Sequence, residues 1–326
     1  MSHDEVIRPT ESQIRELAYK FWDKRRGDGF DSVDWYHAEK KLLIDLNYDL
    51  AAWYPFETCD EENFGYSDDP TCRYCGRKRP TVRFRKGNAH AIPDFLGNDK
   101  LFSYDECVTC NGKFSNYETS FGDLTLSLRK YLGIRNPKVP SETLNLNLKN
   151  KTLSFANNQK ISVYPIKIFK LLTKCALAVM PAECLFEFNR AIEWIGEKDH
   201  SKLPEGWSAL PCYFSSLPGP ILQDASVAAL YFRNSAAALP GALFMLRARN
   251  IAFQIPIPLC NFDGNRVTLP FPFNPPFPVF SPEHGRPHSE LHVLNSHEKT
   301  PIGNVVQMKF GSFDLRVEQT PSRFSN

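Results

Sequence analysis

The sequence has no uninterrupted apolar run of about 20 residues, the length that a membrane-spanning helix needs. The longest candidate, Ala225 to Leu246, is broken by Arg233, Asn234 and Pro240. The N-terminal stretch MSHDEVIRPTES also lacks the apolar core of a secretory signal peptide. We therefore predict a cytoplasmic protein that has no membrane partner.

The chain has little net charge, because 39 Lys and Arg oppose 37 Asp and Glu. Its formal charge of +2 therefore does not by itself indicate a polyanionic partner. The charges are unevenly distributed, with acids concentrated in residues 57–69 and bases in residues 77–86. A charge run is usually a solvated face, but this basic run leads directly to a histidine, His90. A nucleic-acid contact is the functional alternative.

Nine cysteines are present, and disulfides are rare in a reducing compartment. Four of them form two Cys-x-x-Cys pairs, Cys72 with Cys75 and Cys107 with Cys110. This spacing predicts a closed structural zinc site with four thiolate ligands. The alternative is two separate redox or structural features. We expect the other five cysteines to be small buried residues or surface thiols.

The order of the patterns predicts an α+β protein in four parts. Residues 8–48 form a helical hairpin and residues 49–70 an acidic linker. Residues 71–122 form the zinc-stapled unit. Residues 123–326 form a mixed α/β C-terminal region, expected to position substrate, sense a ligand or bind a partner.

The expected hairpin begins with Thr10 as N-cap and Gln13 at the capping-box position. Its apolar residues recur at helical spacing, which predicts core aromatics. The segment resembles a small bacterial domain of unknown function at Ile14, Ala18, Tyr19, Trp22, Gly27, Gly29, Trp35, Ala38, Glu39 and Leu42. That resemblance implies no chemistry, and an adaptor or docking role is the alternative.

In the C-terminal region, a helix is expected to continue through residues 123–135 and to end at Gly133, and another to span residues 166–180. Alternation predicts strands at 209–214, 227–232, 243–247 and 251–255, and a final hairpin over 305–317. Residues 267–281 carry Pro-Phe repeats, which are incompatible with regular ladder strands.

Within the central unit, the segment from Thr81 to Arg85 alternates, which predicts a strand with Arg83 and Arg85 on one face. The unit as a whole resembles the HNH endonuclease superfamily. The matching residues are Cys72, Cys75 and Gly76; Ala89, His90, Ile92 and Pro93; Leu96, Gly97 and Asn98; and Glu106, Cys107, Cys110 and Asn111.

The resemblance implies a ββα-metal fold and a metal-dependent endonuclease that hydrolyses phosphodiester bonds in DNA. Zinc would be structural, and Mg²⁺ or Mn²⁺ would be the catalytic ion, a hard cation that prefers oxygen ligands. His90 matches the general base, a role that an imidazole can fill near neutral pH. Asn111 matches a residue that binds the catalytic ion. The alternatives are a buried structural histidine and a simple helix N-cap.

The sequence departs from the family pattern at one position that usually holds a metal ligand. Many relatives place an acid or a histidine immediately before the base, where this chain has Ala89. Other oxygens must then hold the ion, and Asn98 and Glu118 are the main candidates, with Asp105 and Glu106 also possible. Ala89 favours an alternative function, a zinc-stabilised nucleic-acid-binding module without catalysis. A nuclease directed at RNA is a third alternative.

Phosphate contacts are expected from Arg83, Arg85 and Lys113, with solvated surface charges as the alternative. The histidines of the Pro-rich tail fit no helical spacing and are expected at the surface. The sequence gives no prediction of the oligomeric state.

Overall fold

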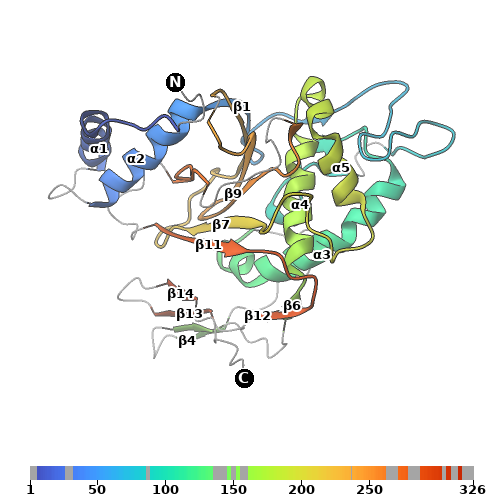
Figure 1. The fold of residues 1–326 in the computed structure, drawn as a ribbon. Coiled ribbons are helices and arrows are strands. Elements are labelled where there is room, and N and C mark those ends of the chain that lie inside the picture. Colours follow the sequence, from blue (N-terminus) through green and yellow to red (C-terminus); the bar gives the residue numbers. More distant parts are fainter. Residues whose placement is uncertain are drawn as a thin grey trace, which may run out of the picture.

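The structure, a computed structural model, describes residues 6–25, 32–85, 89–134, 145–147, 152–154, 161–235, 237–261, 271–277, 287–302, 306–309 and 315–317. The expected α+β class is confirmed. The described residues contain five α-helices and a six-stranded antiparallel sheet, with smaller sheets beside it (Figure 1). Among the described helices, none combines the length and the apolar character needed to cross a membrane.

The N-terminal hairpin consists of α1 (Glu11–Arg25) and α2 (Ser32–Asn47). The capping box is confirmed: the Thr10 amide donates to Oε1 of Gln13 at 2.8 Å, and the Gln13 amide donates to Oγ1 of Thr10 at 3.3 Å. Ala18 and Ala38 are fully buried between the helices, with aromatic residues around them. The core interpretation of this segment is therefore confirmed.

The main sheet has the strand order β1-β8-β9-β10-β7-β11. All of its neighbouring strands are antiparallel. Its strands are β1 (Tyr48–Tyr54), β7 (Pro211–Ser216), β8 (Val227–Arg233), β9 (Ala242–Ala248), β10 (Ile251–Pro256) and β11 (His288–Val293). The four strands expected between residues 209 and 255 are thus confirmed, with shifts of one or two residues at their ends.

The stretch expected to be an acidic linker contains two strands instead. Strand β1 pairs with β8 at the edge of the main sheet. Strand β2 (Glu62–Phe64) pairs in parallel with β3 (Leu101–Ser103). The sequence YDLAAWY of β1 has only one acid, Asp49. Its tyrosine and tryptophan residues favour a strand, and its burial pattern is that of a partly buried edge strand.

The two faces of the main sheet are covered by different parts of the chain, because neighbouring side chains along a strand point to opposite faces. On one face, side chains of β8 and β9 join the large core with α4 (Pro165–Ala178); they are Ala228, Leu230, Phe244 and Leu246. On the other face they join Ile44 and Tyr48; they are Val227, Ala229, Tyr231, Leu243 and Met245.

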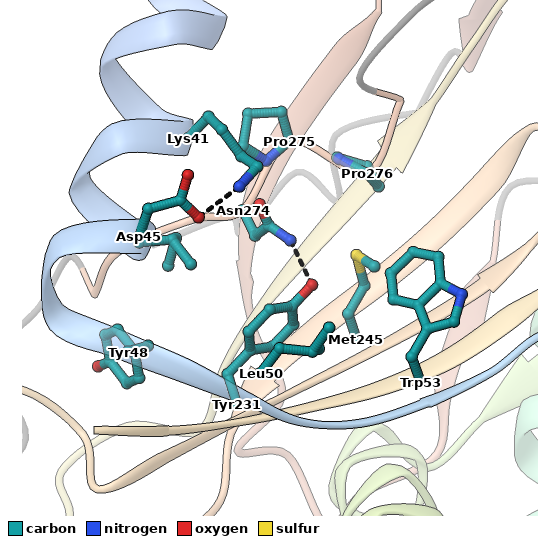
Figure 2. Close-up of a pocket in the computed structure, with 11 residues that line it drawn as sticks. Lys41, Asp45, Tyr48, Leu50, Trp53, Tyr231, Met245, Asn274, Pro275 and Pro276 are labelled. Carbon is teal, nitrogen blue, oxygen red and sulfur yellow. Dashed lines mark hydrogen bonds and ion pairs between the residues drawn. The ribbon is translucent and has the colours of Figure 1, made fainter. Parts of the chain in front are cut away.

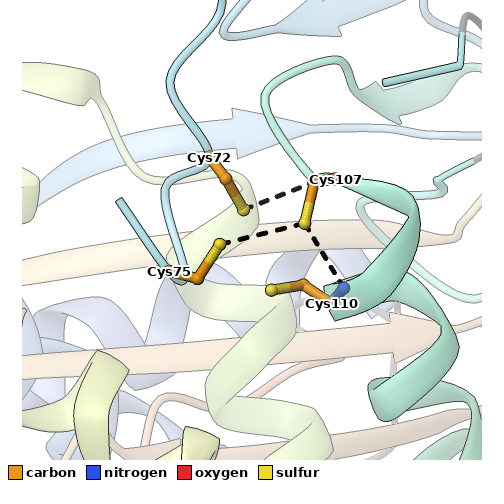
Figure 3. Close-up of side chains that lie close together, drawn as sticks. All are labelled: Cys72, Cys75, Cys107 and Cys110. Atoms are coloured by element: carbon orange, nitrogen blue, oxygen red, sulfur yellow. Dashed lines mark hydrogen bonds between the residues drawn. The ribbon is translucent and has the colours of Figure 1, made fainter. Parts of the chain in front are cut away.

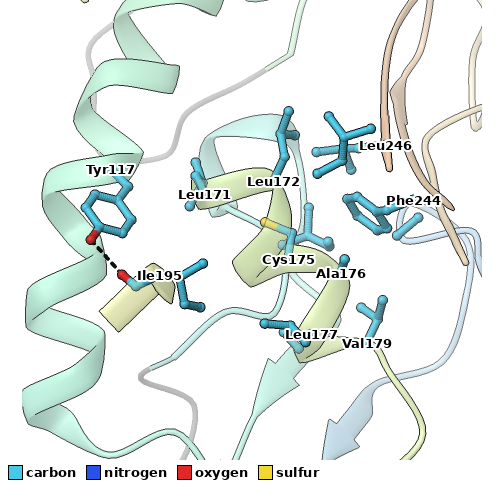
Figure 4. Close-up of a cluster of buried hydrophobic side chains, with 14 of the residues drawn as sticks. Tyr117, Leu171, Leu172, Cys175, Ala176, Leu177, Val179, Ile195, Phe244 and Leu246 are labelled. Atoms are coloured by element: carbon cyan, nitrogen blue, oxygen red, sulfur yellow. Dashed lines mark hydrogen bonds between the residues drawn. The ribbon is translucent and has the colours of Figure 1, made fainter. Parts of the chain in front are cut away.

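Helix α4 lies at the centre of the large core, where almost all of its side chains are buried (Figure 4). It packs against α3 (Val108–Tyr131) and α5 (Asn189–Gly196), and the 3-10 helix η2 (Ala182–Phe188) precedes α5. Helix α3 runs without a break through residue 122, where a domain boundary was expected. Its Phe121 ring lies 4.9 Å from that of Phe253 in β10, so the cysteine-bearing unit and the C-terminal region share one core.

The remaining strands form two small sheets. One has the order β14-β13-β5-β4, and in the other β6 pairs with β12. Their bounds are Asn145–Asn147 (β4), Thr152–Ser154 (β5), Ile161–Val163 (β6), Thr300–Ile302 (β12), Val306–Lys309 (β13) and Leu315–Val317 (β14). The antiparallel pairing of β13 with β14 confirms the final hairpin. Within residues 271–277 the Pro-Phe segment forms no strand, as expected, and buries Phe271, Phe273 and Phe277.

Candidate metal centre and active site

The four paired cysteines converge at the N-terminus of α3. Their Sγ atoms all lie within 4.8 Å of one another (Figure 3). The sulfur atoms of Cys75 and Cys107 are 3.9 Å apart. In a tetrahedral zinc site with Zn–S bonds of about 2.3 Å, the sulfurs are separated by about 3.8 Å. The four cysteines can therefore hold a structural metal such as zinc, as their spacing predicts.

The turn that carries the first pair is closed by the backbone. The Gly76 amide donates to the Cys72 carbonyl at 2.8 Å, and Gly76 has a φ of 66°, which favours glycine. Amide groups also point at sulfur: the Cys107 amide lies 3.4 Å from Sγ of Cys72, and the Cys110 amide 3.5 Å from Sγ of Cys107. A hydrogen bond from the Cys110 side chain lowers the pKa of the Cys72 thiol, whereas burial raises the pKa of the Cys107 thiol. Thiolate is the form that binds a metal.

The first cysteine turn is docked on the C-terminus of α4. Arg73, whose side chain is 3% exposed, donates to the carbonyls of Leu177 and Ala178 and pairs with Asp105 at 2.8 Å. The Tyr74 hydroxyl donates to the Lys174 carbonyl at 3.3 Å. An arginine at the end of a helix satisfies carbonyls that have no partner within the helix. The four-cysteine cluster is therefore anchored to the C-terminal region.

His90 lies on a short segment that pairs with β3. The Ser103 amide donates to the Ala89 carbonyl at 2.8 Å, and the Ala91 amide donates to the Leu101 carbonyl at 2.9 Å. Residues 89–91 thus run antiparallel to β3, and the chain enters α3 soon after β3. His90 is half-buried, and its ring centroid lies 4.9 Å from that of Phe102.

The segment from Thr81 to Arg85 is not the expected strand. Its backbone makes other contacts: the Val82 amide donates to the Lys78 carbonyl at 3.2 Å, and the Arg83 carbonyl accepts from the Val108 amide at 2.9 Å. The alternation of burial persists, because Val82 is buried while Arg83 and Arg85 are exposed. Both arginines therefore remain available for contact with a partner.

Asn98 fixes the loop between His90 and β3, after the 3-10 helix η1 (Asp94–Leu96). Its Nδ2 donates to the carbonyls of Ile92 and Leu101 at 2.5 and 3.1 Å. Its Oδ1 accepts from the amides of Lys100 and Leu101 at 3.2 and 2.9 Å. The side chain is buried and both of its polar atoms are used, so the structure does not favour the expected role of Asn98 as an ion ligand.

A lysine that sequence reasoning missed lies between the two halves of the site. Nζ of Lys174, in α4, is 3.0 Å from Oε2 of Glu106 and donates to the His90 carbonyl at 2.7 Å. The side chains of Lys174 and Glu106 are 1% and 0% exposed. Burial raises the pKa of Glu106 to about 7, although Lys174 opposes that shift. Its helix, PIKIFKLLTKCALA, contains three lysines among mostly apolar residues, and nothing in the sequence distinguishes Lys174 from the other two.

Asn111 lies in the first turn of α3, where its amide donates to the Cys107 carbonyl at 3.0 Å. Because α3 begins at Val108, the N-cap interpretation of Asn111 is wrong. Glu118 lies two helical turns further on, near the same helical face. Its negative charge contributes to raising the pKa of both Glu106 and Lys174.

Lys113 was expected to contact phosphate, but it caps α5. Its Nζ donates to the Gly196 carbonyl. The neighbouring carbonyls of Ile195 and Trp194 accept from the Tyr117 hydroxyl at 2.8 Å and from Nζ of Lys170 at 2.9 Å. A cation at a helix C-terminus is a stabilising arrangement, so packing accounts for Lys113.

No protein-family model, curated protein or solved structure matches this chain. The function of the chain is therefore inferred from the geometry of the site. Within the described part of the chain, only the four cysteines gather as a group of three or more His, Cys, Asp or Glu ligands. An ion near His90 would need amide oxygens, or oxygens of a substrate, in addition to carboxylates.

Proposed function

We propose that the protein is a metal-dependent endonuclease of the HNH type that acts on DNA, with zinc structural and Mg²⁺ or Mn²⁺ catalytic. The observation that carries the proposal is one spatial order. The segment bearing His90 lies between the two cysteine pairs and runs antiparallel to β3, the second pair lies at the start of α3, and Asn111 lies in the first turn of that helix. This order is what the HNH resemblance of the sequence implies.

In this proposal His90 is the general base that accepts a proton from the attacking water. A bound Mg²⁺ or Mn²⁺ supplies charge neutralisation at the phosphate and the leaving oxygen. Asn111 would hold that ion through its amide oxygen, and Glu118 is the nearest candidate carboxylate on the same helix. Lys174 fixes the backbone of His90 through its hydrogen bond to the carbonyl.

The exposed Arg83 and Arg85 precede His90 in the chain and are suited to phosphate contacts, which position a nucleic acid without reading its bases. Lys113 does not belong to this surface, because its Nζ donates to the Gly196 carbonyl at the end of α5.

Plasmid nicking with Mg²⁺ or Mn²⁺ tests the proposal. The His90→Ala variant should lose cleavage and keep its zinc content, whereas His297→Ala, a change at an exposed histidine, should cleave like the wild type. Cleavage by His90→Ala at the wild-type rate would disprove the assignment of the base.

A second function, a zinc-stabilised nucleic-acid-binding module without catalysis, is favoured by two observations. Ala89, in the place of an ion ligand, is 3% exposed and carries no ligand atom. Both polar atoms of the Asn98 side chain form hydrogen bonds within its own loop. Binding to DNA without cleavage under any divalent ion would support this function. A comparison of RNA cleavage with DNA cleavage distinguishes an RNA-directed nuclease from these two functions.

A further inference from the structure

The four cysteines of the cluster differ in their exposure to solvent. Cys75 is exposed, whereas Cys72, Cys107 and Cys110 are buried. Residues 75–81, which begin with this cysteine, are all exposed. A small oxidant in solution can therefore reach the sulfur of Cys75, while the other three sulfurs are shielded until the cluster opens.

The surroundings of Cys75 are those of a reactive cysteine. Three exposed cations follow it closely in the chain, namely Arg77, Lys78 and Arg79. Reactive cysteines lie in partly exposed, electropositive sites, because the thiolate and not the thiol is the nucleophile. A cysteine that binds a metal is also held as the thiolate. Access and negative charge on the sulfur, the two conditions for attack on a peroxide, therefore occur together at Cys75.

A second sulfur lies close to that of Cys75. Its Sγ is 3.9 Å from Sγ of Cys107, which belongs to the other pair (Figure 3). A disulfide bond is about 2.05 Å long, so a movement of about 2 Å by the exposed turn would close it. An oxidised cysteine with a thiolate this close condenses to a disulfide. Cys107 is therefore placed to react with Cys75 after its oxidation.

Cys107 is joined to the site around His90 by two polar contacts. The residue before it, Glu106, pairs with Nζ of Lys174 at 3.0 Å, and the same ammonium group donates to the His90 carbonyl at 2.7 Å. The side chains of Glu106 and Lys174 are almost completely buried, so water cannot readily replace a lost partner. A displacement of Cys107 is therefore transmitted to the backbone of His90.

We propose that Cys75 is an oxidation site through which a peroxide inactivates the site around His90. The Cys75 thiolate attacks hydrogen peroxide, the O–O bond breaks, and a sulfenic acid and a hydroxide form. The Cys107 thiolate then attacks the sulfenic sulfur, the S–O bond breaks, and a second hydroxide leaves. The two sulfurs lose two electrons in total, and both hydroxides take protons from solvent to give water. Only two thiolates then remain, too few for a structural zinc site, so the metal is released.

Treatment of the metal-loaded full chain with hydrogen peroxide tests the proposal. A coloured chelator follows metal release, and mass spectrometry locates the bonded cysteines. The double variant Cys59→Ser with Cys184→Ser removes the two half-buried thiols outside the cluster and should respond like the wild type. Cys75→His keeps four ligands, in the set of three cysteines and one histidine that zinc also uses, and should retain its metal.

Met245 is an internal control for general oxidation. It lies beside Trp53 at a cavity on the face of the main sheet that α4 does not cover (Figure 2). Met245 is 2% exposed, so its conversion to the sulfoxide should be slower than metal release. Met245→Leu should leave metal release unchanged. Metal release that occurs only together with oxidation of Met245 would show general damage and would overturn the proposal.

Hydrogen exchange reports the consequence near His90 without DNA. The Ala91 amide donates to the Leu101 carbonyl at 2.9 Å, so its exchange should become faster after oxidation and recover when a thiol reductant and zinc are added. Plasmid cleavage, the readout that rests on the proposed function, should be lost and recovered in parallel. A wild type that never cleaves would count against that function alone, because metal release and hydrogen exchange still decide this proposal.

Three further results would overturn the proposal. They are metal that stays bound while Cys59 and Cys184 are oxidised, metal release from Cys75→His at the wild-type rate, and unchanged exchange at Ala91 after Cys75 and Cys107 have bonded. If Cys75→His does not fold, a trap for sulfenic acid decides in the double variant Cys59→Ser with Cys184→Ser. The first residue labelled there should be Cys75, and a first label elsewhere would contradict the assignment.

Discussion

Nζ of Lys174 lies 3.0 Å from Oε2 of Glu106, and both side chains are almost completely buried. The same ammonium group donates to the His90 carbonyl at 2.7 Å. One residue of α4 therefore joins the C-terminal region to the segment bearing His90 and to the residue before Cys107. This contact explains why residues 71–122 are part of a larger core and not a separate module.

Removal of the Lys174 ammonium group should destabilise the folded protein. Lys174→Met leaves Glu106 buried without its partner, which lowers the free energy of unfolding by about 3–5 kcal/mol. Urea denaturation measures the change, and Lys198→Met, at an exposed lysine, is the control. The double variant Lys174→Met with Glu106→Leu removes both charges and should recover much of the loss, because the two effects are coupled. Additive losses would contradict the pairing.

The four-cysteine cluster should contain one metal ion per chain. Chelation of that ion should lower the melting temperature, because a structural metal contributes directly to folding. Cys110→Ser should lose the metal and show the same lowered melting temperature, while Cys184→Ser, outside the cluster, should keep the metal. Metal analysis and thermal denaturation provide the two readouts. Full stability after complete removal of the metal would contradict a structural role.

The two arginines and Lys113 should behave differently. Arg83→Ala and Arg85→Ala should each weaken DNA binding and lower the slope of log K against log salt by about 1, with little change in stability. Lys113→Ala should instead lower stability through loss of the α5 cap, by about 0.5–1.5 kcal/mol. Arg15→Ala, on the exposed face of α1, is the control for charge alone. An unchanged salt slope in both arginine variants would remove them from the binding surface.

Lys170 gives a dependence on pH with a definite sign. Burial lowers its pKa from 10.5 to about 8, so between these two values the folded state binds fewer protons than the unfolded state. The free energy of unfolding should therefore gain a contribution that rises with pH from about 8 to 10.5. Denaturation at several pH values, with wild type compared with Lys170→Met, isolates this slope. The same slope in both proteins would show that another group causes it.

Local patterns account for the parts of the fold that were predicted correctly. The capping box at Thr10 and the alternation in β8 to β10 depend on backbone geometry over a few residues, and that geometry leaves its period in the sequence. Strand β1 was missed because an edge strand needs a partner, and its partner β8 lies far away in the chain. The strand expected at Thr81–Arg85 was wrong because alternating burial does not require a ladder partner.

The sequence by itself determined the four-cysteine cluster, the helical hairpin and most strands of the main sheet. Only the tertiary structure shows which polar side chains already have partners within the fold. It assigned Asn98 to its loop, Lys113 to the end of α5 and Lys174 to Glu106 and His90. The physical reason is that the spacing of a Cys-x-x-Cys pair is enough to indicate metal binding. The role of a lysine or an asparagine depends instead on the groups that packing brings within hydrogen-bonding distance.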